Sequence, residues 1–96
     1  MEKSTSNKLK SYIGLAQRAG GVVYGEDSIC EKKKQAKVLL IASDASDKYK
    51  ERMLTKLSDR PVYVVDGLCE ALHRDAVNAV AVSNDGLANA IISLLR

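Results

Sequence analysis

The sequence predicts an α/β fold: a three-layer α/β/α sandwich around a four-stranded, mostly buried mixed sheet. Two observations predict it. Segments with the apolar spacing of helices alternate along the chain with short segments of strand length. One of these, Lys37–Ser43 (KVLLIAS), is a continuous apolar run, which is typical of a strand covered on both faces. At 96 residues the chain has the length of one domain, so we expect a single domain over residues 1–96, with residues 1–6 flexible.

The first predicted helix has one apolar face, with residues at i, i+3, i+4 and i+7: Leu9, Tyr12, Ile13 and Ala16. We expect a hydroxyl residue within positions 4–6 to cap its start and Gly20 or Gly21 to end it. Residues 22–24 (VVY) follow as a short β-branched strand. Residues 25–35 (GEDSICEKKKQ) predict a short helix with acids in its first turn and lysines in its last, as the helix dipole favours.

The middle of the chain continues the alternation after the apolar strand. Residues 44–59 predict a helix capped by Asp44 or Ser46. Its inner face is expected to hold four residues: Tyr49, Met53, Leu54 and Leu57. Pro61 blocks any continuation of this helix and precedes a strand at residues 62–65.

The last third predicts a short helix over residues 66–74, with Asp66 as its cap, and then a strand over residues 79–83. The closing helix covers residues 84–96. Its inward residues are expected to be Leu87, Ile91, Leu94 and Leu95.

Composition excludes several classes of protein. The chain is 46% hydrophobic and 28% charged, as soluble globular proteins are. No apolar run approaches the ~20 residues of a membrane helix, and residues 1–10 lack the apolar region of a signal peptide. Cys30 and Cys69 lack metal-ligand spacing, and with His73 as the one histidine a zinc site or histidine triad has too few partners. We expect a cytoplasmic protein with reduced thiols, no metal, no cofactor and no membrane partner.

Positive charge gathers in the first third of the chain. Residues 1–37 carry a net charge of +4 and residues 38–96 carry −1. The peak is the run Lys32–Lys34. Such a patch attracts polyanions, of which nucleic acid is the commonest in the cytosol, although a lysine run also occurs as a solvated helix face.

The three glycines of residues 20–25 do not form a nucleotide loop. Their spacing, G-G-x-x-x-G, matches neither a Walker-type loop nor a dinucleotide fingerprint. Gly20 and Gly21 lie between a helix and a strand, where a left-handed helix cap accounts for them. Gly25 lies between a strand and a helix, where backbone N–H groups can bind phosphates or base edges, and a plain turn is the alternative.

Catalytic groups are not indicated. The paired carboxylates all fall at predicted helix starts, where capping explains them: Glu26-Asp27, Asp44 with Asp47, and Asp85 after Asn84. Asp44 and Asp66 follow strands as in a phosphoacceptor receiver, but no lysine follows residues 79–83 and the chain is too short for that fold. With four tyrosines and no Phe or Trp, the chain lacks a base-stacking platform. If RNA is the ligand, helix ends, loops and shape must recognise it.

Four stretches, in this order, resemble one family: residues 13–27 (IGLAQRAGGVVYGED), 36–46, 61–65 and 79–91. The chain resembles the kink-turn RNA-binding ribosomal protein family typified by archaeal L-seven-Ae, and most of all its bacterial YlxQ-type branch. The resemblance covers about residues 9–95, and its first motif, L-A-x-x-A-G-x-[VIL]-x-x-G-E-[DE], is fairly specific. It implies an α/β/α sandwich that grips a sharply bent RNA internal loop.

The resemblance also implies a site. In the family, a Gly–x–Asn–Glu–x–x–Lys pattern on the helix after the first strand reads the RNA, and an apolar loop after a later strand covers a flipped-out base. Gly25 matches the glycine, whereas Asp27, Ser28 and Glu31 stand at the Asn, Glu and Lys positions. The implied RNA-binding residues are Gly25, Glu26, Asp27, Ser28, Glu31, Lys32, Lys33, Lys34 and Lys37, with Val65, Gly67 and Leu68 as a second wall.

Glu31 is the main departure from that pattern, because a carboxylate repels a backbone phosphate. Lys32 and Lys34 could replace the missing lysine if the helix is slightly rotated. We expect a small non-enzymatic, ribosome-associated protein that binds a kink-turn or similarly bent RNA, with structured RNA and ribosomal proteins as partners and no small-molecule substrate. The alternative is a protein–protein interaction module on the same fold that has lost kink-turn binding.

Overall fold

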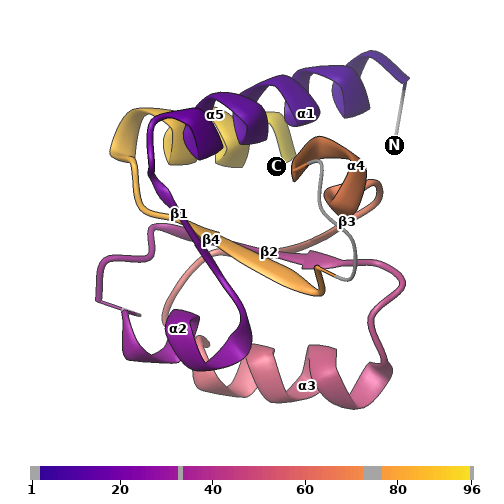
Figure 1. The fold of residues 1–96 in the computed structure, drawn as a ribbon. Coiled ribbons are helices and arrows are strands. Elements are labelled where there is room, and N and C mark those ends of the chain that lie inside the picture. Colours follow the sequence, from indigo (N-terminus) through magenta and orange to yellow (C-terminus); the bar gives the residue numbers. More distant parts are fainter. Residues whose placement is uncertain (1–2, 33, 73–76, 96) are drawn as a thin grey trace.

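The computed structural model describes residues 3–32, 34–72 and 77–95 (Figure 1). Within them helices and strands alternate as predicted. The elements are α1 (Lys3–Arg18), β1 (Val22–Tyr24), α2 (Glu26–Glu31), β2 (Val38–Ala42), α3 (Asp47–Lys56), β3 (Val62–Val65), α4 (Leu68–Leu72), β4 (Ala79–Val82) and α5 (Asp85–Leu95).

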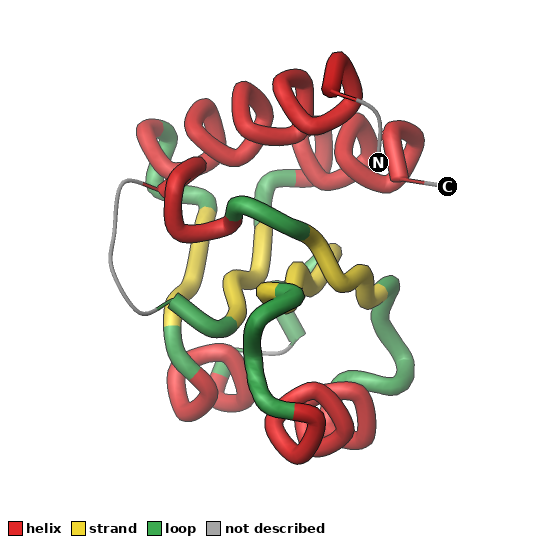
Figure 2. Tube along the Cα trace, turned by 90° about the vertical axis from the view of Figure 1, so that its right-hand side faces the viewer, coloured by secondary structure: helices red, strands yellow, loops and turns green. Residues whose placement is uncertain are grey.

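The four strands form one mixed sheet in the order β1-β4-β2-β3. β4 is antiparallel to both of its neighbours, and β2 is parallel to β3. Helices α1, α4 and α5 cover one face of the sheet, and α2 and α3 cover the other (Figure 1). Figure 2 shows the same two helical layers from the side, with the strands between them. The predicted three-layer α/β/α sandwich is confirmed.

The central strand β2 divides the core into two parts. All five of its residues are buried, and successive side chains point to opposite faces of the sheet. Val38, Leu40 and Ala42 join the cluster under α1, α4 and α5. Leu39 and Ile41 join the cluster over α2 and α3. The continuous apolar run in the sequence is therefore two alternating sets of core residues.

Gly20 and Gly21 end α1, as expected. The Gly21 N–H donates to the Ala16 carbonyl (2.9 Å) and the Gly20 N–H donates to the Gln17 carbonyl (3.1 Å). Gly20 has a φ of +74°, which L side chains rarely adopt. This is the Schellman arrangement, in which glycine takes the left-handed position after the helix.

Two predicted helix starts were wrong. α1 already begins at Lys3, so positions 4–6 lie inside the helix and do not cap it. At α4, the Ala71 N–H donates to the Gly67 carbonyl (3.0 Å), which places Gly67 rather than Asp66 at the N-cap. His73 and Arg74, expected in the same helix, lie outside the described residues. The predicted cap at Ser46 is confirmed, because its hydroxyl accepts from the Tyr49 N–H (3.1 Å).

Helix α2 is shorter than predicted. It ends at Glu31, with Lys32 at its C-cap, so the lysine run does not form its last turn. By Lys37 the chain is already in the sheet, since its N–H donates to the Val82 carbonyl (2.9 Å). The intervening residues must descend from the helical layer to the sheet, and this leaves no room for another helical turn.

Leu54 was wrongly predicted to face inward. Its side chain is 44% exposed, whereas Met53 and Leu57 are 0% exposed. The inward stripe of α3 runs from the half-buried Tyr49 through Met53 to Leu57 at the C-cap, at intervals of four residues. Leu54 lies about 100° around the helix from Met53, which turns it to solvent.

This difference gives a matched test of the core. Leu57→Ala should lower the free energy of unfolding by about 2–5 kcal/mol, because it opens a cavity under the sheet. Leu54→Ala, the same change on the same helix, should lower it by less than about 0.5 kcal/mol. Urea unfolding followed by circular dichroism measures both. Equal losses would contradict the orientation of α3.

Candidate functional site

Three strand ends meet at one edge of the sheet. Tyr24, at the end of β1, lies opposite Val80, near the start of β4. Val65 and Ala42 lie side by side at the ends of β3 and β2. The Ala42 N–H also donates to the carbonyl of Asn78 (2.8 Å), just before β4. We call the residues around these ends the strand-end edge: Gly25–Ser28, Ser43–Asp44, Asp66–Gly67 and Asn78.

Gly25 opens α2 at this edge. It has φ 82° and ψ 147°, and among the described residues no side chain caps the helix. The first helical bond is donated by the Ile29 N–H to the Gly25 carbonyl (3.0 Å). The N–H groups of residues 26–28 are therefore not used by the helix itself. A Cβ at Gly25 would meet nothing within 4 Å, so the backbone conformation, and not crowding, favours glycine here.

The Glu26 carboxylate is held by α3. Arg52 donates from Nε to Oε2 (2.6 Å) and from Nη2 to Oε1 (2.8 Å), and Lys56 Nζ donates to Oε2 (2.8 Å). These bonds, the Arg52 pair first, lower the pKa of Glu26 from 4.5 to about 2. Arg52 also lies 5.4 Å from the centre of the Tyr49 ring. Glu26 was expected among the RNA-binding groups, and in the structure its carboxylate ties α2 to α3.

Asp27 and Ser28 are exposed beside the open helix start. Their side chains make no hydrogen bond or ion pair with another described residue. Glu31 is exposed at the far end of α2. Asp27 and Ser28 therefore share the strand-end edge with Gly25, and Glu31 stands one helix length away from it.

The structure separates the predicted lysines from the strand-end edge. Lys32 and Lys34 are exposed beyond the end of α2, and Lys33 lies outside the described residues. Lys37 enters the sheet at its opposite edge, where its Nζ lies 3.6 Å from Asp85 Oδ1. From Gly25 to Lys32 the helix advances about 10 Å. One RNA contact region would have to extend along the whole of α2 to include both groups.

The predicted second wall is mostly core. Val65 and Leu68 are each 2% exposed and belong to the cluster under α1, α4 and α5. The turn between β3 and α4 is so short that Leu68 packs inward at once. Gly67 is exposed with a φ of +72°, and a Cβ there would lie 3.2 Å from Lys10 Cε. The groups this turn presents to solvent are Asp66 and Gly67.

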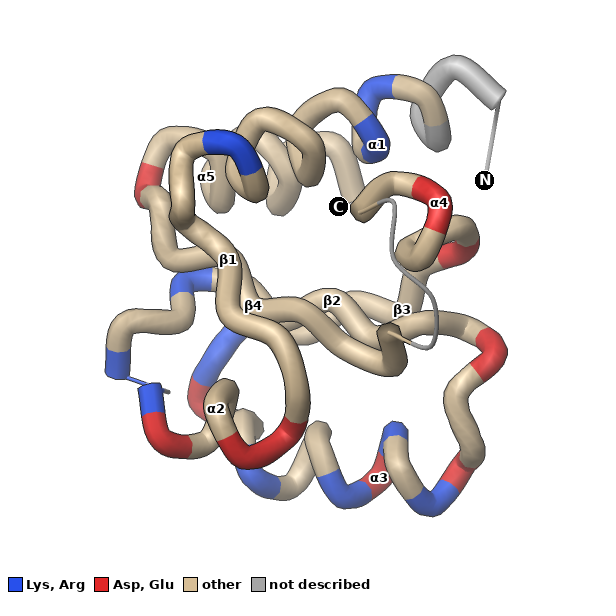
Figure 3. Tube along the Cα trace, in the orientation of Figure 1, with Lys and Arg blue, Asp and Glu red and all other residues tan. Residues whose placement is uncertain are grey.

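A row of cations on α3 was missed by the sequence reasoning. Lys48, Arg52 and Lys56 lie at i, i+4 and i+8, and we call them the α3 cation stripe. Figure 3 shows in blue that Lys and Arg positions recur along α3, below the sheet. The spacing was visible in the sequence, but the net charge of −1 over residues 38–96 concealed it.

No group of three or more His, Cys, Asp or Glu side chains in the described part of the chain could hold a metal. Cys30 and Cys69 are both free thiols. Within residues 3–32, 34–72 and 77–95, no helix is long and apolar enough to cross a membrane.

Comparison with known proteins identifies relatives. No protein-family model matches this chain. RNA-binding protein YlxQ from Bacillus subtilis (strain 168) is 34% identical over 90 residues, covering 86% of this chain and 90% of that protein. A protein of unknown function from Bacillus halodurans C has a TM-score of 0.85 at 26% identity, covering 92% of this chain and 96% of that one. The Giardia lamblia 15.5kD RNA binding protein shares the fold, with a TM-score of 0.74 at 16% identity over 99% of this chain and 88% of that one.

The layers and the mixed four-stranded sheet are those of an L-seven-Ae-like α/β/α domain. The chain belongs to the YlxQ-type branch of that family, which confirms the resemblance drawn from its motifs.

The contacts of Glu26 give a pH-dependent prediction. Its pKa is about 2 in the folded protein against an ordinary 4.5, so its charged form stabilises the fold. That stabilisation is fully present above about pH 4.5 and is lost as the pH falls toward about 2. Glu26→Gln should therefore lower the free energy of unfolding most above pH 4.5, and the difference from wild type should shrink between those values. Urea unfolding at a series of pH values measures it.

Glu51→Gln is the matched control for this series. Its carboxylate is exposed on α3 and makes no ion pair with another described residue, so the variant changes the net charge alone. A difference between wild type and Glu26→Gln that does not change with pH would contradict the ion pairs.

Proposed function

We propose that this chain is a small, non-enzymatic, cytoplasmic RNA-binding protein that recognises a kink-turn or similarly bent RNA and associates with ribosomal RNA or ribosomal proteins. One observation carries the proposal: a protein named as RNA-binding is 34% identical to it over nearly the whole of both chains. The fold of a second protein named as RNA-binding supports it.

The geometry of the strand-end edge supports the same proposal. The unused N–H groups after Gly25 are donors for phosphate oxygens or base edges. Asp27 can accept from a guanine N–H, and the Ser28 hydroxyl can donate or accept. Gly67 lies at the same end of the sheet but after β3, and the Lys10 side chain, another cation, lies against it.

The departures from the family pattern favour the alternative, a protein–protein interaction module. Ser28 and Glu31 replace the expected Glu and Lys, and Val65 and Leu68 are buried and offer no apolar wall to a flipped-out base. A partner protein would not require those groups. RNA binding remains the better supported of the two, because the relationship extends over nearly the whole chain.

A gel-shift assay separates the two functions. We expect the wild-type protein to shift a kink-turn duplex at concentrations that leave an unbent duplex of the same length unshifted. Equal shifts would keep RNA binding but remove recognition of the kink. Absence of any shift at low salt would refute the proposal and favour the interaction module, since phosphate contacts are strongest there.

Glu31→Lys tests the family's lysine position. It replaces a repulsive carboxylate by a cation, so kink-turn affinity should rise and its salt dependence should steepen by about one unit of slope. Asn89→Lys and Ser93→Lys combined make the same change of two charge units at exposed positions on α5, in the opposite helical layer. An equal gain in both variants would show that only net charge matters. Weaker binding by Glu31→Lys would mean that the family's site has moved.

A further inference from the structure

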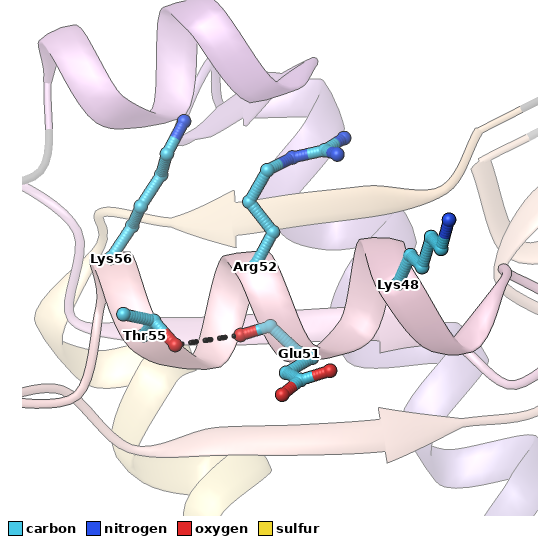
Figure 4. Close-up of a pocket in the computed structure, with 5 residues that line it drawn as sticks. All are labelled: Lys48, Glu51, Arg52, Thr55 and Lys56. Atoms are coloured by element: carbon cyan, nitrogen blue, oxygen red, sulfur yellow. Dashed lines mark hydrogen bonds between the residues drawn. The ribbon is translucent and has the colours of Figure 1, made fainter.

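The α3 cation stripe is spaced to bind a ligand whose negative charges repeat at regular intervals. Its residues lie four apart, so they share one face of the helix at intervals of about 6 Å. Figure 4 shows Lys48, Arg52 and Lys56 rising from the same side of α3, while Glu51 points the other way. With Thr55, these four residues line one open hollow on the surface.

The stripe keeps positive charge in the folded protein. The Arg52 and Lys56 side chains are 49% and 45% exposed, so their heads remain within reach of a ligand. Lys48 is exposed and makes no hydrogen bond or ion pair with another described residue. Glu26 neutralises one of the three charges and the Glu51 carboxylate, which also lines the hollow, offsets a second, so a net excess of one remains.

The way in which α3 holds Glu26 is also a way to hold a phosphate. Arg52 donates two parallel bonds to the two carboxylate oxygens, and Lys56 adds a third donor. Paired donation by a guanidinium suits carboxylates and phosphates alike. Two of the five guanidinium donors are used here, so Arg52 can bind a second anion beside Glu26 or exchange Glu26 for it.

We propose that the α3 cation stripe is a second phosphate-binding surface for RNA, next to the strand-end edge, and that Glu26 occupies part of it in the free protein. This inference rests on the proposed function. Lys48 contacts a backbone phosphate directly, and phosphates compete with Glu26 for Arg52 and Lys56.

An RNA backbone fits this surface better than an acidic protein segment does. Its charges repeat at short, regular intervals, as those of the stripe do. A protein partner would add apolar contact, but the exposed Leu54 is two residues beyond Arg52 and therefore about 200° around the helix, on the other flank of α3.

The test compares two variants of opposite sign on one probe, a kink-turn duplex with extended stems. Lys48→Gln should weaken binding, and its loss of affinity between 50 and 200 mM salt should be about threefold smaller than that of wild type, as expected for one lost contact. Glu26→Gln frees two cations, so it should tighten binding. Its loss of affinity between 50 and 200 mM salt should be at least about threefold larger than that of wild type. Fluorescence anisotropy across salt concentrations measures both.

Lys8→Gln is the matched control, because Lys8 is exposed on α1 in the opposite helical layer. It should leave the salt dependence unchanged. If the wild-type protein binds neither bent nor unbent RNA, the proposed function fails. If it binds but Lys48→Gln behaves as Lys8→Gln does, the stripe is overturned while the proposed function stands. Lys48 has no partner among the described residues, so this result holds even if Glu26→Gln does not fold.

Discussion

Burial of β2 on both faces is the constraint on which the rest of the structure depends. Five consecutive apolar residues can be covered only if helices pack above and below the sheet and strands flank it on both sides. The two helical layers follow from this single strand, because its alternate side chains belong to different clusters. The middle of the sheet is thus closed to ligands, and binding must take place where strands end or on the outer faces of the helices.

Most of the fold could be predicted from local patterns, since each strand and helix carries its own periodicity. Two of the errors, the length of α2 and the orientation of Leu54, share one cause. The length of α2 is set by how soon the chain must reach the sheet at Lys37, and the exposure of Leu54 by the angle at which α3 packs. The residues of α2 alone do not determine its length, and those of α3 alone do not determine the exposure of Leu54. Both depend on elements that are distant in the sequence.

The candidate site was predicted less completely, for a similar reason. Gly25 could be found, because a glycine between a strand and a helix has a local meaning. Glu26 bonds to Arg52 and Lys56, which lie 26 and 30 positions further along the chain. No pattern within either segment predicts such a distant contact. Val65 and Leu68 have the apolar character of a binding wall, but Val65 ends β3 in the core and a two-residue turn returns Leu68 to the same cluster. The cations that contact the start of α2 therefore come from α3, and not from the lysine run.

The arrangement of the layers has a consequence for how the molecule can be attached to something else. α1 and α5 pack side by side on the face of the sheet away from α2 and α3. A fluorophore, a fused domain or a solid support joined through either of these helices is kept apart from the cations of α3 by the full depth of the sandwich, in a molecule measuring 30 × 25 × 25 Å. The protein can in this way be tethered from one side while α2 and α3 stay open to the surroundings on the other.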